Sequence, residues 1–218
     1  MKRKKLVFDM DGTLLESMYM WRNFMSLYKD FKFKKKIEEE LPNLTKSSAL
    51  AHSIIMVKQA LNEDLDDNQI AQKIHAFLYK FYTSENRAKN TVENTIRNLH
   101  NKGFDIYLAT ATDYLYAFEG IKKANILEYF NKIYTPDKLG IKKYDIDYYK
   151  TIRDDLGVNS EDIIFFDDAY YALKLAKNAG FHTIGVHDDL AEDINLVRKF
   201  SDYFINDLSE IENIIDRI

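Results

Sequence analysis

Two aspartates separated by one residue, Asp9 and Asp11, stand directly after a short apolar run at residues 6–8. Alternate side chains of an extended segment point the same way, so both carboxylates could face one site. Two acids beside a buried strand are costly unless a cation or a polar reaction centre offsets them. Gly12 allows a close backbone turn, which the Thr13 hydroxyl can hold. These residues fit either a strand that ends in an Asp-Gly turn or a site for chemistry.

Two further polar clusters follow apolar runs in the same way. Thr110-Ala111-Thr112 follows the run 107–109, and Asp167-Asp168 follows the run 163–166. Parallel strands would bring all three clusters to one edge of a sheet, where four carboxylates repel and raise one another's pKa unless something positive joins them. A hard cation is the natural partner, because Mg²⁺ takes one or two carboxylates, keeps several waters and accepts a phosphate oxygen.

The order of the predicted elements supplies such a sheet. Apolar runs predict strands at residues 104–109, 132–134, 163–166 and 182–186, with helices between them and an edge strand at 203–205 before a last helix. The runs do not alternate in polarity, as expected for strands covered on both faces. Strands alternating with helices indicate parallel pairing and ligand binding beyond the carboxyl ends of the strands. We therefore predict an α/β fold with a doubly wound, mostly parallel, Rossmann-like sheet.

The helix ends carry their own signals. Asn90 and Glu93 stand three residues apart before an apolar stripe, which predicts a capping box, and Gly103 closes that helix. A second helix is expected from about Asp145 to residue 156, closed by Gly157.

Between the first strand and residue 89 the pattern is helical. Apolar stripes at helical spacing include one at Leu50, Ile54, Val57 and Leu61 and another at Ile70, Ile74, Phe77, Leu78 and Phe81. We predict an all-helical cap domain at residues 17–88, inserted into a core formed by residues 1–16 and 89–218.

Composition narrows the class of protein. The chain has 218 residues, a net charge of −4 and no cysteine. A general nucleic-acid binder would need a basic footprint, and the missing cysteines exclude a disulfide framework or a thiol nucleophile. No apolar stretch approaches a signal peptide or a membrane span in length. We expect a cytoplasmic protein, a monomer or dimer, that binds neither nucleic acid nor membrane.

The motif Asp9-Met10-Asp11-Gly12-Thr13-Leu14 resembles the first motif, DxDGT, of the haloacid dehalogenase-like hydrolases, which are mostly phosphatases and phosphotransferases. Leu108-Ala109-Thr110-Ala111 resembles the second motif, an apolar strand that ends in Ser or Thr. The segment 163–168 resembles the fourth, acidic motif, and Asp168 stands twelve residues before Gly180, the spacing expected of the metal-binding acid. The resemblance spans about residues 6 to 186, and the helical insert resembles the small cap of phosphoglycolate phosphatases and β-phosphoglucomutases.

The third motif of that family is a lysine, and three lysines are candidates here. Lys143 can be aligned with the lysine of the family pattern Lys-Pro-Asp-Pro-Glu, although both prolines are missing. This alignment places Asp145 at the N-cap of a helix. Lys142 or Lys138 could serve instead. The fourth motif also departs, since Tyr170-Tyr171-Ala172 replaces small polar residues or a further acid.

The resemblance implies a role for each site residue. Asp9 would attack phosphorus and form an aspartyl-phosphate, while Asp11 would protonate the leaving group and then deprotonate water. Mg²⁺ would be held by Asp9, the backbone carbonyl of Asp11 and Asp168, with Asp167 as an accessory acid.

The phosphoryl oxygens would be held by the Thr110 hydroxyl, by backbone N–H groups such as that of Ala111, and by Lys143. The implied function is a Mg²⁺-dependent phosphatase acting on a small phosphorylated metabolite. A sugar-phosphate mutase and a non-catalytic metabolite-binding protein on the same fold are the alternatives. Four aromatic residues of the insert are candidates to line the substrate interface or to pack within the cap: Tyr19, Trp21, Phe24 and Tyr28.

Overall fold

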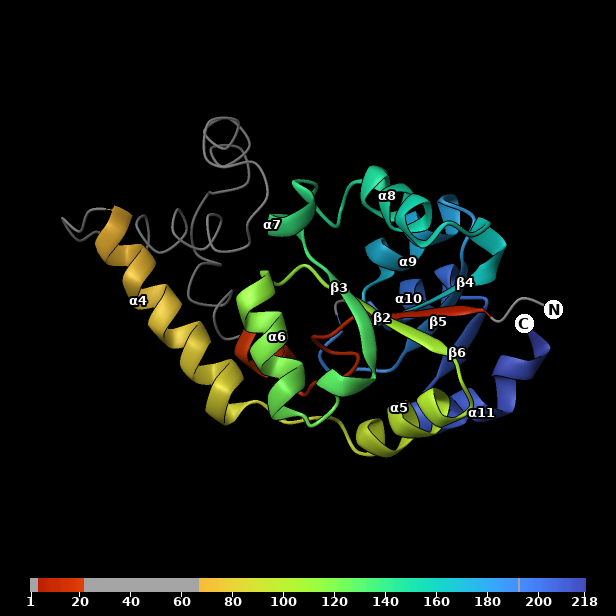
Figure 1. The fold of residues 1–218 in the computed structure, drawn as a ribbon, viewed down its shortest axis with the longest axis horizontal. Helices are drawn as coiled ribbons and strands as arrows, with labels where there is room; N and C mark the ends of the chain where they lie inside the picture. The colour runs from red at the N-terminus through yellow and green to blue at the C-terminus, as the bar shows by residue number, and fades with distance from the viewer. Residues whose placement is uncertain (1–3, 22–66, 192) are drawn as a thin grey trace.

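A six-stranded parallel sheet forms the centre of the protein, as seen in a computed structural model that describes residues 4–21, 67–191 and 193–218. The strand order is β3-β2-β1-β4-β5-β6 (Figure 1). The strands are β1 (Lys5–Phe8), β2 (Asp105–Ala109), β3 (Phe130–Tyr134), β4 (Ile163–Asp167), β5 (His182–Val186) and β6 (Tyr203–Ile205). The chain builds first to one side of β1 and then to the other, so the predicted doubly wound, Rossmann-like sheet is confirmed.

Helices cover both faces of the sheet, and one further helix, α4 (Asp67–Lys80), extends away from it (Figure 1). The others are α5 (Val92–Asn101), α6 (Tyr114–Lys123), α7 (Pro136–Leu139), α8 (Ile146–Leu156), α9 (Tyr170–Asn178), α10 (Ile194–Phe200) and α11 (Ile211–Ile214). Leu6 and Phe8 of β1 pack with α5, α6 and α11, while Val7 packs with α8, α9 and α10. Because both faces are buried, β1 needs no polar alternation. Within the described ranges, no helix is long and apolar enough to cross a membrane.

Local capping signals explain one helix and fail for another. The Asp145 side chain accepts a hydrogen bond from the backbone N–H of Asp147, and Gly157 closes α8 in the left-handed conformation, as predicted. The capping box predicted at Asn90 and Glu93 is wrong. The N-cap of α5 is Thr91, which makes no side-chain cap and instead donates its hydroxyl to Asp207, at 2.8 Å.

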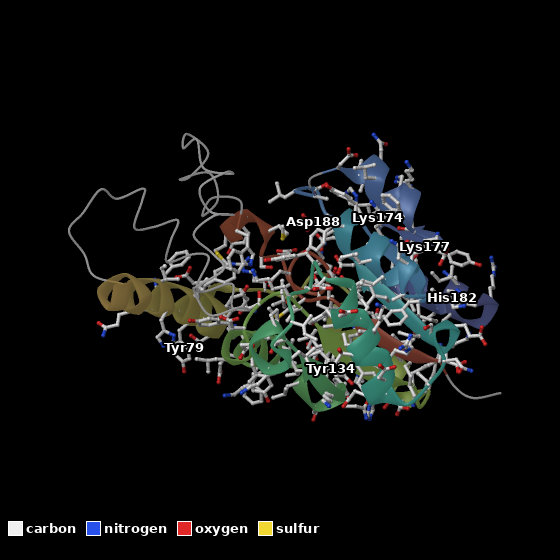
Figure 2. The ribbon with its side chains drawn as sticks, turned by 90° about the horizontal axis from the view of Figure 1, so that it is seen from above. Tyr79, Tyr134, Lys174, Lys177, His182 and Asp188 are labelled. Atoms are coloured by element: carbon white, nitrogen blue, oxygen red, sulfur yellow. The ribbon has the colours of Figure 1, made fainter. Side chains whose placement is uncertain are left out.

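The described residues of the insert are helical at 18–21 and in α4, which projects from the sheet-containing body (Figure 2). Ile74 and Leu78 are buried as the predicted stripe requires, but Phe77 is exposed. The stripe at residues 50–61 lies outside the described residues, so the all-helical cap at 17–88 stays a prediction. Its two connections to the core pair with each other, since Leu15 and Ala88 form an antiparallel bridge.

Candidate active site

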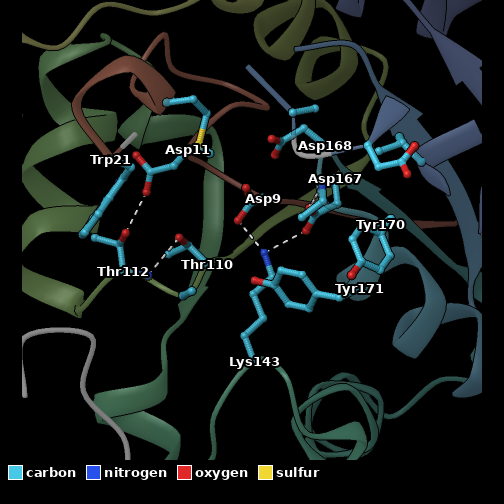
Figure 3. A pocket seen from close by; sticks show the side chains of 16 residues that line it. Asp9, Asp11, Trp21, Thr110, Thr112, Lys143, Asp167, Asp168, Tyr170 and Tyr171 are labelled. Carbon is cyan, nitrogen blue, oxygen red and sulfur yellow. Dashed lines mark hydrogen bonds and ion pairs between the residues drawn. The ribbon is translucent and has the colours of Figure 1, made fainter. Parts of the chain in front are cut away.

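The polar clusters meet in one cavity beyond the carboxyl ends of β1, β2 and β4 (Figure 3). This is the place where the strand order reverses, between β1 and β4, and where such sheets bind ligands. The cavity has a volume of about 260 Å³. Its lining includes every predicted site residue: Asp9, Asp11, Thr110, Ala111, Lys143, Asp167 and Asp168.

A buried lysine lies between two of the acids. Lys143 Nζ is 2.5 Å from Asp9 Oδ1 and 2.8 Å from Asp167 Oδ2, and the Lys143 side chain is only 3% exposed. Burial alone would lower the pKa of Lys143, but the charges of Asp167 and Asp9 outweigh it and raise that pKa well above its usual value. Lys143 therefore stays a cation across the neutral range.

The other two candidate lysines lie elsewhere. Lys138 Nζ lies over the ring of Tyr114 and Lys142 Nζ over the ring of Tyr144. Neither lines the cavity. Of the three lysines that the sequence left open, the structure brings Lys143 to the acids.

Three carboxylates gather in this part of the cavity. One oxygen each of Asp9, Asp167 and Asp168 lie within 4.8 Å of one another, and all three residues are buried. Burial raises the pKa of Asp167. Burial, together with the negative charges of Asp167 and Asp9, raises the pKa of Asp168 well above its usual range. Of these three buried acids only Asp9 and Asp167 pair with Lys143, so the cluster keeps an excess of negative charge, which a bound cation would offset. The oxygen donors and their crowding fit Mg²⁺.

The turn after β1 is shaped around Asp168. Gly12 has a φ of +83°, and a Cβ there would come 2.4 Å from Asp168 Oδ2, so no larger residue fits without displacing that acid. Thr13 donates its hydroxyl to Asp168 Oδ1 at 3.3 Å. The hydroxyl predicted to hold the local turn thus joins the first and fourth motifs instead.

Asp11 does not join the three carboxylates. Its Oδ1 accepts a hydrogen bond from the Tyr82 hydroxyl at 2.8 Å, and its Oδ2 accepts one from Thr112 Oγ1 at 2.7 Å. Burial, followed by the Asp9 charge, raises the pKa of Asp11. The spacing predicts a cluster of four carboxylates. The structure instead groups three of them and turns the fourth, Asp11, toward a separate wall of the cavity (Figure 3).

The loop after β2 supplies a polar wall. Thr110 is 1% exposed, and its hydroxyl accepts a hydrogen bond from the backbone N–H of Thr112 at 3.2 Å. The Tyr148 hydroxyl of α8 donates to the Thr110 carbonyl at 3.1 Å. These bonds fix the loop so that Thr110 and Ala111 line the cavity.

Aromatic residues complete the described part of the lining. Trp21, one of the four predicted candidates, lines the cavity, whereas Tyr19 is 47% exposed; Phe24 and Tyr28 lie outside the described residues. Sequence reasoning did not place Tyr170 and Tyr171 of α9 in the lining, although it noted them as departures from the fourth motif. Such rings offer apolar surface beside the charged centre.

Tyr82 is a residue of the site that the sequence pattern did not single out. It falls one position after the helical stripe that ends at Phe81 and four after the buried Leu78, so a regular helix would place it at the edge of the buried face. The helix changes instead to a π-helix at Phe81–Glu85, and both Phe81 and Tyr82 are buried. The spacing of apolar residues in the sequence does not predict this change from an α-helix to a π-helix.

A parallel sheet with acids, a lysine and hydroxyls at its switch point defines an α/β enzyme core suited to an anionic substrate. The family model for haloacid dehalogenase-like hydrolases matches residues 6–186. The chain belongs to this family of hydrolases.

Individual proteins resemble the chain over most of its length. A Clostridium perfringens protein provisionally named pyrophosphatase PpaX is 23% identical over 219 residues. The match covers 99% of this chain and 98% of the length of the relative. A Thermotoga maritima phosphorylated carbohydrates phosphatase is 20% identical and covers 82% of each chain. The crystal structure of a predicted phosphoglycolate phosphatase from Haemophilus somnus is 17% identical, has a TM-score of 0.76 and covers 98% of each chain.

Proposed function

We propose that this protein is a Mg²⁺-dependent phosphatase that hydrolyses a small phosphorylated metabolite through an aspartyl-phosphate on Asp9. The observation that carries the proposal is the buried ion pair of Asp9 and Lys143 inside a small cavity. A carboxylate there can act as a nucleophile, while the adjacent cation attracts the phosphate group. The phosphatase names of two relatives support the same reaction type.

In the first half-reaction an Asp9 carboxylate oxygen forms a bond to phosphorus, and the bond from phosphorus to the leaving oxygen breaks. Asp11 gives its proton to that oxygen, so the product leaves as an alcohol. In the second half-reaction water attacks phosphorus, Asp11 takes its proton, and the bond to Asp9 breaks to release inorganic phosphate.

The remaining residues hold the phosphoryl group. The Thr110 hydroxyl, the backbone N–H of Ala111 and the Lys143 ammonium would bind its oxygens and stabilise the developing charge. Asp9, Asp168 and the backbone carbonyl of Asp11 would hold Mg²⁺, with Asp167 as an accessory acid that also pairs with Lys143. The bound ion would supply charge neutralisation as an anionic phosphate approaches anionic Asp9.

The test is phosphate release from a panel of metabolites by the purified protein, with Mg²⁺ and with a chelator. The panel begins with phosphorylated carbohydrates and inorganic pyrophosphate, because the relatives carry those names. We expect metal-dependent release by the wild type and none by Asp9→Asn, which keeps the shape of the side chain. Circular dichroism would check that the variant is folded.

Three other outcomes would overturn the proposal or its assignment of Asp9. Isomerised sugar phosphate with little free phosphate would indicate a mutase that uses the same residues. Binding of a metabolite without any turnover would indicate a binding protein on this fold. Full activity of Asp9→Asn would remove Asp9 as the nucleophile.

A further inference from the structure

Tyr82 connects the end of α4 to the candidate active site. The change to a π-helix at Phe81–Glu85 is marked by the hydrogen bond from the Asn86 N–H to the Phe81 carbonyl, at 2.9 Å. Single π-helical turns occur frequently at functional sites. Here the turn buries the Tyr82 side chain completely and brings its hydroxyl to Asp11.

The hydroxyl of Tyr82 belongs to a chain of hydrogen bonds with one direction. Trp21 Nε1 donates to the Tyr82 hydroxyl at 3.0 Å, and that hydroxyl donates to Asp11 Oδ1 at 2.8 Å. An indole N–H is only a donor, so the single phenolic proton of Tyr82 is directed to Asp11. Burial, with the Asp11 charge next, raises the pKa of Tyr82 well above its usual value, so the phenol remains a donor.

The second oxygen of Asp11 is held from the opposite side. Thr112 Oγ1 donates to Asp11 Oδ2 at 2.7 Å (Figure 3). Tyr82 and Thr112 thus each donate to a different carboxylate oxygen from separate parts of the fold. The buried Ser17 hydroxyl is a further polar neighbour of this carboxyl and favours its charged form. Tyr82 itself does not line the cavity, whereas Asp11 does.

We propose that Tyr82, oriented by Trp21, is a positioning residue that sets the direction of the Asp11 carboxyl for proton transfer to the leaving group. This inference rests on the proposed phosphatase function. Phenylalanine would fill the same buried space, so packing alone does not require the hydroxyl. The hydroxyl is required for the hydrogen bond to Asp11. Without it, Asp11 Oδ1 loses its 2.8 Å donor, and the Thr112 bond and the nearby Ser17 hydroxyl no longer hold the carboxyl in one direction about its Cβ–Cγ bond.

The leaving group separates positioning from general structural damage. An alkyl phosphate needs a proton on its departing oxygen, because an alkoxide is a strong base. p-Nitrophenyl phosphate needs little help, because p-nitrophenolate is a weak base and leaves unprotonated. Misdirection of Asp11 should therefore slow the first half-reaction of the alkyl ester selectively.

The experiment compares Tyr82→Phe with the wild type in rapid-mixing assays of the first turnover at saturating substrate. The probes are p-nitrophenyl phosphate and the best alkyl phosphate from the metabolite panel. We expect a loss on the order of 10- to 100-fold for the alkyl phosphate and less than about 3-fold for the aryl phosphate, with KM little changed. Asp11→Asn sets the maximum selective loss.

Tyr134→Phe is the matched control. Its buried ring lies on β3 (Figure 2), and its hydroxyl donates to Asp155, away from the cavity. We expect this variant to treat both substrates as the wild type does. If Tyr82→Phe fails to fold, Trp21→Phe removes the donor that orients Tyr82, and the ratio of the two first-turnover rates is again the readout.

The outcomes separate the two proposals. A wild type that cleaves neither phosphate overturns the proposed function and this inference with it. An active wild type, together with equal losses on both substrates or no loss in Tyr82→Phe, overturns only the role of Tyr82. A selective loss for the alkyl phosphate supports both.

Discussion

Lys143 and Asp9 are 134 residues apart in the chain, yet their Nζ and Oδ1 atoms lie 2.5 Å apart in a buried ion pair. The same ammonium is 2.8 Å from Asp167 Oδ2. One cation therefore holds the end of β1 against the end of β4. The loop before α8 is as much a part of the site as the strands, because it carries this lysine.

Replacing Lys143 by methionine should damage both stability and catalysis. Removal of one partner leaves buried acids without their cation, which costs about 3–5 kcal/mol in the free energy of unfolding. We expect that loss in urea unfolding without added metal, together with a large fall in kcat/KM for phosphate release. Lys142→Met is the matched control, because that ammonium lies over the Tyr144 ring outside the cavity. Equal effects of the two substitutions would contradict the role of Lys143.

Magnesium should raise the melting temperature of the protein. A ligand that binds only the folded state at 100 times its Kd adds about 2.7 kcal/mol, which corresponds to roughly 5–10 °C for a chain of this size. Asp168→Asn should abolish most of this shift in differential scanning fluorimetry. Asp155→Asn, which removes a carboxylate paired with Lys132 on the surface, should keep it. A shift that survives in Asp168→Asn would place the ion elsewhere.

Gly12→Ala should weaken metal binding more than it weakens the fold. The added Cβ would meet Asp168 Oδ2 at 2.4 Å, so the acid must move. We expect the Mg²⁺ dissociation constant to rise on the order of 10-fold, measured by calorimetric titration. Gly140→Ala is the control, because Gly140 has a similar φ of +70° and its Cβ would meet nothing within 4 Å. If both variants bind Mg²⁺ equally well, Gly12 does not shape the metal site.

Acid should remove the stability contributed by Asp207. Burial raises the pKa of this carboxyl, but bonds from Ser209 and Thr91 outweigh it and hold the pKa below its usual value. A lowered folded pKa means that the unfolded chain binds the proton more readily. The contribution is thus present above the unfolded pKa of about 4 and is lost as pH falls through the folded pKa.

The measurement for Asp207 is urea unfolding of Asp207→Asn between pH 2.5 and pH 6. We expect a deficit of about 1 kcal/mol against the wild type at pH 6 that shrinks toward zero at the acid end, because both side chains are then neutral. Asp189→Asn is the control, since the Asp189 side chain is 94% exposed. A deficit independent of pH would indicate loss of packing instead of loss of charge.

Much of the fold could be predicted from local pattern because its causes are local. The strand at His182–Val186 follows from a run of five residues, and the ends of α8 follow from Asp145 and Gly157. The motif at Asp9 to Thr13 and the acids at Asp167-Asp168 likewise stand beside the strands that present them. Parallel pairing then follows from the alternation of strands and helices.

The tertiary structure decided which side chains meet. Contacts between residues far apart in the chain select Lys143 over two neighbouring lysines and separate Asp11 from the other acids. Such a contact also brings the Tyr82 hydroxyl to Asp11. The π-helical turn and the Thr91 bond to Asp207 override local period and capping in the same way. Helical or strand periodicity tells which way a side chain points from its own element. Only the packed elements determine what lies opposite.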